Sequence, residues 1–126
     1  MELFDLALEE AAELLAKKEV SSVELTKAVI ARMQATEPQV NAYLAQTPEN
    51  ALAQARAADQ RIAAGQATPL TGIPAGLKDV ICTQGLTTTC GSKMLENWAP
   101  PFDAFLAARL KDAGMVLLGK HNMDEF

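Results

Sequence analysis

The sequence predicts an α/β fold, on three observations spread over its 126 residues. Residues 1–66 carry small and apolar side chains at helical spacing, with charged residues between them. Residues 67–126 begin with short apolar runs broken by glycine and proline, continue with one helical segment and end with another apolar run. A strand, a helix and a further strand in this order are typical of α/β architecture, with the helices of residues 1–66 as an outer layer. The length suits one domain.

Two helices are expected at the start of the chain. Apolar side chains at helical spacing, opposed by acids, predict an amphipathic helix over roughly residues 5–18. Ser21 and Glu24 have the separation of a capping box, which marks the start of a second helix. We expect Pro38 to end that helix, because proline cannot donate a backbone hydrogen bond.

A short strand and a third helix follow. Val40–Leu44 contains one β-branched and one aromatic residue and predicts a short strand. Pro48 suits the first turn of a helix, and Gly65 suits the residue after its end. Between them, one face carries small side chains that would let a neighbour pack closely, at Ala51, Ala55 and Ala58.

The second half of the chain is expected to hold strands, loops and one helix. Ile73–Lys78 is interpreted as extended, and the hydroxyl side chains of Thr87–Ser92 as turn formers rather than the lining of a polar pocket. Asp103 is expected to cap a helix that Gly114 ends. Met115–Leu118 is a continuous apolar run, which is typical of a buried strand.

The charge balance and composition exclude several functions. Eleven Lys and Arg against sixteen Asp and Glu give a formal net charge of −5, which disfavours binding to nucleic acid phosphates. The acidic first residues are unlike a secretory signal or a transit peptide, and no apolar run is long enough to span a bilayer. Cys82 and Cys90 are too few for a disulfide scaffold, so we expect reduced thiols in the cytoplasm.

Three stretches imitate known sites without completing them. Gly114–Lys120 has the spacing of a phosphate-binding loop, but His121 stands where a magnesium-binding hydroxyl is needed. Gly85–Lys93 lacks the spacing itself. His121, Asp124 and Glu125 offer too few ligands for a metal ion, and one histidine leaves no Ser-His-Asp triad. We expect no cofactor or metal to be bound by these residues.

Lys78 is the remaining candidate for chemistry. In an extended segment its neighbours on the same face are Pro74 and Gly76, which leave space around the amine. An enclosed lysine can give up its proton and act as a base. Asp79 would face the other way and need not neutralise it. Spacing alone favours an exposed strand lysine, because catalytic lysines are the exception among lysines.

Five motifs stand in one gap-free run from Leu70 to Phe126. They are GIP at Gly72–Pro74, KD at Lys78–Asp79, SKMLEN at Ser92–Asn97, RL-x-x-AG at Arg109–Gly114 and GK-x-NMDEF at Gly119–Phe126. This run resembles the amidase signature family. KMLEN and NMDEF favour, within it, the A subunits of tRNA-dependent amidotransferases. The resemblance implies an N-terminal portion of the amidase signature fold, a mixed sheet flanked by helices, with residues 1–126 as part of one amidase domain.

The resemblance also implies a catalytic role for Lys78. Members of this family use a Ser, cis-Ser, Lys triad, and the lysine of the GIP-x-x-x-KD segment is its base. Both serines and a glycine-rich turn of the family lie downstream of the NMDEF segment, so residues 1–126 are expected to be inactive alone. Ser21, Ser22 and Ser92 do not stand in the family's serine context and are not substitutes.

Several positions depart from the family's usual residues. Gly76 stands where Ala is usual, Val80 where Asn often follows KD, and His121 where Thr is common. Phe102 and Phe105 replace Tyr and Thr. None of these changes Lys78 itself, so the resemblance still implies an active protein.

The resemblance further implies partners. A complete protein of this kind hydrolyses glutamine and passes ammonia to a partner subunit, which uses ATP and magnesium to activate a misacylated tRNA. The product would be Gln-tRNA(Gln) or Asn-tRNA(Asn), made from Glu-tRNA(Gln) or Asp-tRNA(Asn) in a complex with B and C subunits.

Two alternatives remain open from the sequence. One is a free-standing amidase of the same family that acts on a small amide. The other is a truncated, non-catalytic fragment; against it, we expect the strands that pair with Met115–Leu118 to be missing and the sheet to be incomplete, with an exposed edge that promotes association.

Overall fold

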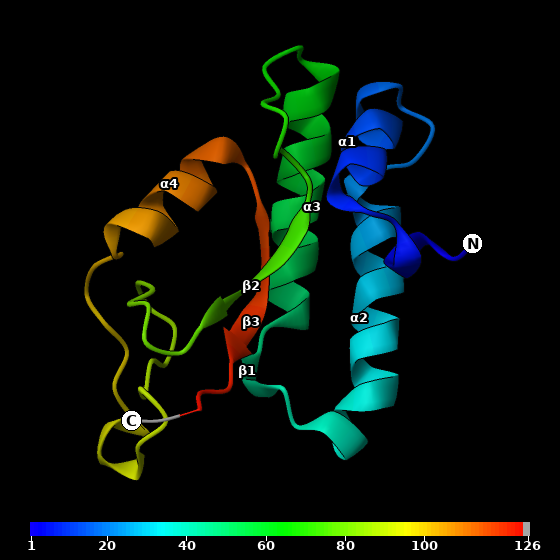
Figure 1. Cartoon of the computed structure of the whole chain (residues 1–126). Helices are drawn as coiled ribbons and strands as arrows, with labels where there is room; N and C mark the ends of the chain where they lie inside the picture. The colour runs from blue at the N-terminus through cyan, green and yellow to red at the C-terminus, as the bar shows by residue number, and fades with distance from the viewer. Residues whose placement is uncertain (125–126) are drawn as a thin grey trace.

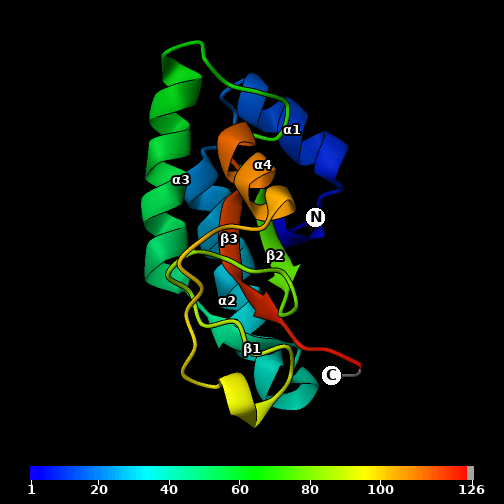
Figure 2. The same ribbon diagram turned by 90° about the vertical axis from the view of Figure 1, so that its left-hand side faces the viewer.

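The computed structural model describes residues 1–124, which form a three-stranded sheet between two helical layers. Helices α2 and α3 cover one face of the sheet and α4 covers the other (Figure 1), and the view turned by 90° shows the same order of layers (Figure 2). The elements in chain order are η1 (Leu3–Asp5), α1 (Leu8–Ala16), α2 (Ser22–Val40), β1 (Tyr43–Gln46), α3 (Pro48–Ala63), β2 (Pro74–Lys78), η2 (Lys93–Leu95), α4 (Phe105–Ala113) and β3 (Val116–His121). The predicted α/β class with a mixed sheet is confirmed.

The last strand, β3, lies in the middle of the sheet, whose order is β1-β3-β2. It pairs antiparallel with β1, and parallel with β2 through the crossover helix α4. The expectation that Met115–Leu118 would lack pairing strands was therefore wrong. Its neighbours come from residues far earlier in the chain, and no local pattern in the sequence reveals such distant pairing.

The helical layer packs on the sheet through small side chains. Ala51 and Ala55 of α3 have no exposed surface, and they meet Ile30 and Met33 of α2 and Leu118 of β3 in one apolar cluster. The alanine face predicted for the third helix is thus confirmed. Small residues there allow α2, α3 and β3 to approach closely.

The opposite face of the sheet is covered by α4. Leu77 of β2, Leu117 of β3 and Ala107 of α4 form a second buried cluster, and Ala107 has no exposed surface. Gly114 ends α4 in the left-handed conformation with φ 88°, as predicted. Asp103, predicted to cap this helix, does not, because Ala104 occupies the N-cap. The Asp103 carboxylate instead accepts a hydrogen bond from Gln84 N and pairs with Lys111 at 2.7 Å.

The first two helices differ from the prediction at their ends. The first begins at Leu8 and not near residue 5, because Ala7 is extended and its N–H donates to the Glu10 carboxylate at 2.8 Å. Pro38 does not end α2, which runs on to Val40. A proline in the last turn removes only one helical hydrogen bond, so the helix tolerates it there.

The first strand is shifted as a result. Asn41, with φ 52°, ends α2 and donates its N–H to Glu37 O at 2.8 Å. Because Val40 is helical, the strand predicted at Val40–Leu44 begins instead at Tyr43 and ends at Gln46. Over residues 1–124, no helix has both the length and the apolar character needed to cross a bilayer.

Candidate functional site

Lys78 is the last residue of β2 and lies opposite His121, the last residue of β3. The carboxyl ends of parallel strands meet at one edge of a sheet, which is where α/β proteins place their sites. The Lys78 side chain keeps 49% of its surface exposed, and its ammonium lies 3.2 Å from the Asp124 carboxylate. The amine is therefore only partly covered by the described residues, and another group can reach it.

The space expected beside Lys78 is filled by an imidazole. A Cβ built on Gly76 would lie only 2.7 Å from Cδ2 of His121, and closer still to Nε2 and Cε1. The same ring contacts Tyr43 edge-to-face, with centroids 4.7 Å apart. The prediction of free space beside Lys78 was therefore wrong, because the His121 ring occupies the space that Gly76 leaves. The two departures from the family pattern at Gly76 and His121 are thus in direct contact.

The carboxylate next to the lysine points away from it, in agreement with the alternation expected of an extended segment. Asp79 is 1% exposed, and its carboxylate accepts hydrogen bonds from the N–H and the hydroxyl of Thr89. Its own N–H donates to His121 O at 3.0 Å and so extends the ladder between β2 and β3 by one residue beyond Lys78.

Lys120 is a buried charge that was not predicted from the sequence. Its side chain has no exposed surface, and its ammonium donates to Ile81 O at 2.6 Å and to Thr88 Oγ1 at 2.8 Å. The Asp79 carboxylate lies 3.8 Å away. Burial lowers the pKa of Lys120, and the negative charge of Asp79 acts in the opposite direction.

The position of Lys120 also argues against a phosphate-binding loop at Gly114–Lys120. Residues 116–121 are a strand, and the enclosed ammonium faces protein groups only. The signal that sequence reasoning missed is a lysine that continues an apolar run in a strand already expected to be buried. Such a charge requires a buried partner.

The hydroxyl-rich loop supplies part of this buried cluster. Thr88 binds Lys120 and Thr89 binds Asp79, whereas Ser92 caps η2 by accepting from Met94 N at 3.2 Å. The threonines also make local turn contacts, because Thr88 Oγ1 donates to Leu86 O and Thr89 Oγ1 accepts from Gly91 N, each at 3.1 Å. The expected turn chemistry therefore holds for these residues, and the two threonines in addition bind the buried pair. A cavity of about 390 Å³ separates this loop from β1, and its lining comprises Leu44, Ala45, Thr87, Thr89, Gly91, Ser92, Lys93 and Glu96.

The serines that were not expected to be catalytic have structural contacts. Ser21 caps α2 by accepting from Glu24 N, and Ser22, fully buried, donates to Gly72 O at 2.8 Å. Ser92 is engaged in the cap of η2. Within residues 1–124, no three or more His, Cys, Asp or Glu are grouped so that they could hold an ion, and Glu125 lies outside the described residues.

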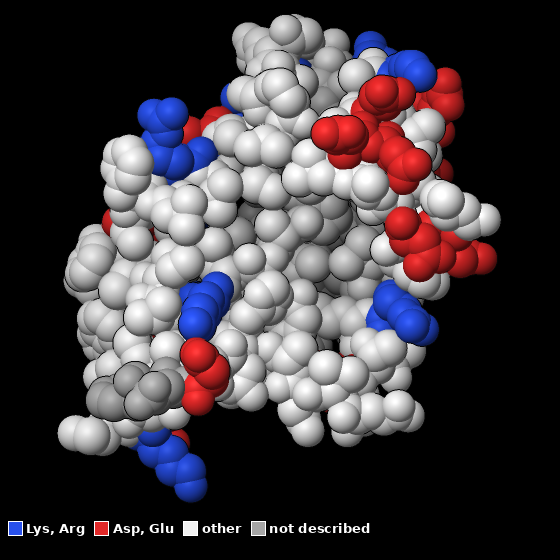
Figure 3. All heavy atoms as spheres, in the orientation of Figure 1, with Lys and Arg blue, Asp and Glu red and all other residues white. Residues whose placement is uncertain are grey.

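The face seen in Figure 3 is hollowed between the sheet and the N-terminal helices, and acidic side chains gather over the end that holds η1 and α1. A cavity of about 320 Å³ lies at this junction of η1, α1, α2 and β2, with apolar walls that include Phe4, Leu25, Ile73 and Ala75.

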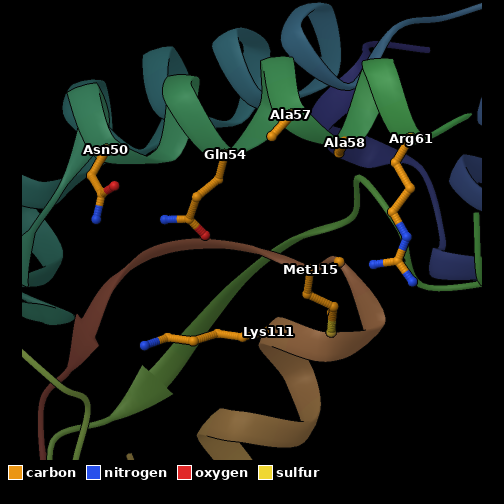
Figure 4. A pocket seen from close by; sticks show the side chains of 8 residues that line it. Asn50, Gln54, Ala57, Ala58, Arg61, Lys111 and Met115 are labelled. Atoms are coloured by element: carbon orange, nitrogen blue, oxygen red, sulfur yellow. The ribbon is translucent and has the colours of Figure 1, made fainter. Parts of the chain in front are cut away.

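A further hollow of about 390 Å³ lies between α3 and α4. Figure 4 shows Gln54 and Arg61 reaching into it from α3, opposite Lys111 and Met115. These polar groups are already engaged in the fold. Gln54 Oε1 accepts from Leu117 N at 3.0 Å, and Arg61 donates to Asp112 O at 2.8 Å. This hollow does not include Lys78, so we do not assign the chemistry to it.

The site thus combines an accessible amine at a strand end with a buried polar cluster directly behind it. The chain belongs to the amidase family, whose model matches residues 24–126.

Particular relatives are similar over the whole chain. It is 58% identical over 126 residues to the A subunit of the glutamyl-tRNA(Gln) amidotransferase of Geobacter sulfurreducens, and 59% identical over 124 residues to the protein of the same name from Roseiflexus castenholzii. The chain spans about a quarter of the length of these relatives, 26% and 25% respectively.

Solved structures share the fold. The peptide amidase of Stenotrophomonas maltophilia superposes with a TM-score of 0.89 at 34% identity, over 96% of this chain and 25% of that one. An amidase family protein of Bacillus anthracis gives a TM-score of 0.87 at 30% identity, again over 96% of this chain and 25% of that one. The chain therefore corresponds to the N-terminal part of the amidase fold.

Proposed function

We propose that the chain is the N-terminal part of the glutamine-hydrolysing subunit of a tRNA-dependent amidotransferase, a ligase of the glutaminyl-tRNA synthase (glutamine-hydrolysing) type. The observation that carries this proposal is the identity of 58% over all 126 residues to the A subunit of a glutamyl-tRNA(Gln) amidotransferase. The relatives favour this function over a free-standing amidase. The complete protein supplies ammonia for the conversion of Glu-tRNA(Gln) or Asp-tRNA(Asn) to Gln-tRNA(Gln) or Asn-tRNA(Asn).

Lys78 is the base in this proposal. Its neutral amine accepts a proton from a bridging serine, which takes one from the nucleophilic serine as that oxygen attacks the carboxamide carbon of glutamine. The C–N bond breaks, the proton returns to the leaving nitrogen, and ammonia departs from an acyl-enzyme. Water then releases glutamate. Both serines, and the backbone N–H groups that bind the oxyanion, belong to the remainder of the protein.

The surroundings of Lys78 support this role. Its ion pair with Asp124 joins two exposed side chains, of 49% and 87% exposure, and pairs of this kind contribute only about 0–1 kcal/mol. The contact is therefore easily exchanged for a serine hydroxyl. Asp79 is held by Thr89 and does not compete for the amine.

Partner subunits complete the activity. In the proposal, a B subunit binds ATP, magnesium and the misacylated tRNA, a C subunit joins the complex, and the assembly works in the cytoplasm. The formal charge of −5 supports this division of labour, because an acidic chain is poorly suited to hold tRNA phosphates.

The test is Lys78→Ala in the full-length protein with its partners. Removal of a general base should lower glutamine hydrolysis by about 10²–10⁴-fold. Lys17→Ala is the matched control, since Lys17 is also exposed and also pairs with a carboxylate, that of Glu13 at 3.6 Å. Control activity should stay normal, and near-normal turnover of Lys78→Ala would exclude Lys78 as the base.

A further inference from the structure

Burial of the Lys120 ammonium costs desolvation free energy, and the pairing of the strands does not depend on a charge at this position. Its side chain has no exposed surface, and its Cα pairs with that of Leu77, whose apolar side chain is 4% exposed. Apolar residues in place of both Lys120 and Asp79 would satisfy the same positions, because buried ion pairs rarely stabilise a fold more than well-packed apolar residues do. A role other than bulk stability is therefore needed to explain the charge.

The contacts of Lys120 all lead to one segment. Ile81 O, Thr88 Oγ1 and the Asp79 carboxylate belong to the connection between β2 and α4, in which the three-residue η2 is the only helix or strand described. A segment with so little regular structure has few backbone ladders to hold it. The Lys120 ammonium instead joins the beginning of the connection, at Ile81, to its middle, at Thr88, through two hydrogen bonds.

Asp79 completes the attachment on the side of Lys78. Its carboxylate receives Thr89 N at 3.0 Å, its carbonyl accepts from Cys90 N at 3.1 Å, and its N–H donates to His121 O at 3.0 Å. The residue bonded directly to Lys78 is thus fixed by both its backbone and its side chain. Asp79 therefore fixes one end of the peptide bond that joins it to Lys78.

We propose that Lys120 and Asp79 are positioning residues that hold the backbone of Lys78 in the orientation its proton transfer requires. This inference rests on the proposed function, in which Lys78 is the base. Neither residue touches the substrate. The pair acts through the peptide bond between Lys78 and Asp79 and through the loop that carries Thr88 and Thr89. Misplacement of a reacting group by about 1 Å can cost about 10²-fold in rate, so a small loosening of this anchor is measurable.

The experiment uses the full-length protein with its partner subunits and measures kcat and KM for glutamine, normalised to the folded fraction. Lys120→Met keeps an unbranched side chain that is one heavy atom shorter, and it removes the charge. We expect kcat to fall about 30- to 100-fold with KM changed less than about threefold. Lys111→Met is the matched control, because Lys111 also pairs with an aspartate, at 2.7 Å, but at the surface. Its kcat should be unchanged.

A double variant separates positioning from stability. Lys120→Met alone leaves the Asp79 carboxylate buried without its counter-charge, and Lys120→Met/Asp79→Asn removes that charge as well, so thermal stability should recover. Under the proposal kcat stays low, because the tie between Ile81, Thr88 and the sheet is still missing. Recovery of kcat together with stability overturns the proposal, as does a Lys120→Met kcat within threefold of wild type.

Two further variants, Thr88→Val and Lys78→Ala, test the proposal if Lys120→Met fails to fold and separate it from the proposed function. If Lys120→Met does not fold, Thr88→Val removes one of the Lys120 hydrogen bonds with little change of shape, and it should lower kcat about 3- to 10-fold at constant KM. An unchanged kcat there also overturns the proposal. Retained activity of Lys78→Ala contradicts the proposed function itself, which distinguishes that failure from a failure of the positioning role.

Discussion

Gly76 is the position at which one added methyl group gives the clearest test of the structure. Its φ is not among the positive values, so alanine is allowed by the backbone, and the three atoms nearest to the new Cβ all belong to the His121 ring. The new Cβ would lie 2.7 Å from His121 Cδ2, about 1 Å inside the usual carbon–carbon contact distance. Overpacking of this kind costs about 1–3 kcal/mol. Displacement of the ring from Tyr43 adds about 0.5–1.5 kcal/mol.

We therefore expect Gly76→Ala to lower the local stability of β2 by about 1.5–4.5 kcal/mol. Native-state hydrogen exchange of the peptide that contains β2, in the full-length protein, measures this opening free energy. His121→Thr removes the obstacle, so the double variant Gly76→Ala/His121→Thr should recover most of the loss, with a coupling energy of about 1–3 kcal/mol.

Gly119 provides the contrast. It pairs with Gly76 across the sheet, but a Cβ there would collide with the backbone carbonyl of Ala45, and its φ of 156° is unfavourable for alanine. Gly119→Ala should thus not be rescued by His121→Thr. Additive effects in the Gly76 cycle would refute the steric argument.

Two further predictions concern hydrogen bonds of single carboxylates. Asp59 of α3 accepts hydrogen bonds from Ser22 N at 2.7 Å and Val23 N at 3.1 Å, and so caps α2 from a neighbouring helix. Asp59→Ala should lower the free energy of opening of the first turn of α2, measured by hydrogen exchange, by about 1–2 kcal/mol. Equal protection of this turn in both proteins would contradict the capping role. The hydrogen bond from Lys111, and that from Gln84 N, hold the pKa of Asp103 below its usual value, so its stabilising contribution is present above the ordinary aspartate pKa and is lost as pH falls through the lower folded value. The difference in thermal stability between wild type and Asp103→Asn should accordingly shrink below about pH 4, and a difference that stays constant there would show that the carboxylate is not responsible.

Local patterns predicted the interiors of the elements better than their ends. The alanine face of α3 and the left-handed end at Gly114 follow from spacing and backbone preference alone. The prediction from Pro38 was wrong because α2 continues to Val40 although Pro38 cannot donate a backbone hydrogen bond. Asp103 misled because its carboxylate has a better partner in Lys111, a residue eight positions away.

The candidate site was predictable in its accessible part only. A lysine at the end of an extended, glycine-containing segment was found from the sequence, and its placement at the end of β2 agrees. The buried cluster was not found, because Lys120 and Asp79 are 41 positions apart and come together only when β2 pairs with β3. Likewise, the contact between Gly76 and His121 depends on the register of that pairing.

The central place of β3 has a consequence for the order of events during translation. β1 and β2 leave the ribosome earlier, yet they are not neighbours in the sheet, and neither can form its ladder until β3 has been made. Helices α2 and α3 need nothing later than Ala63 for their mutual contact, so they can dock first. Emergence of β3 then completes the antiparallel and the parallel ladder at once. The same strand brings Lys120 to Asp79, so this part of the surroundings of Lys78 forms in the step that joins the three described strands.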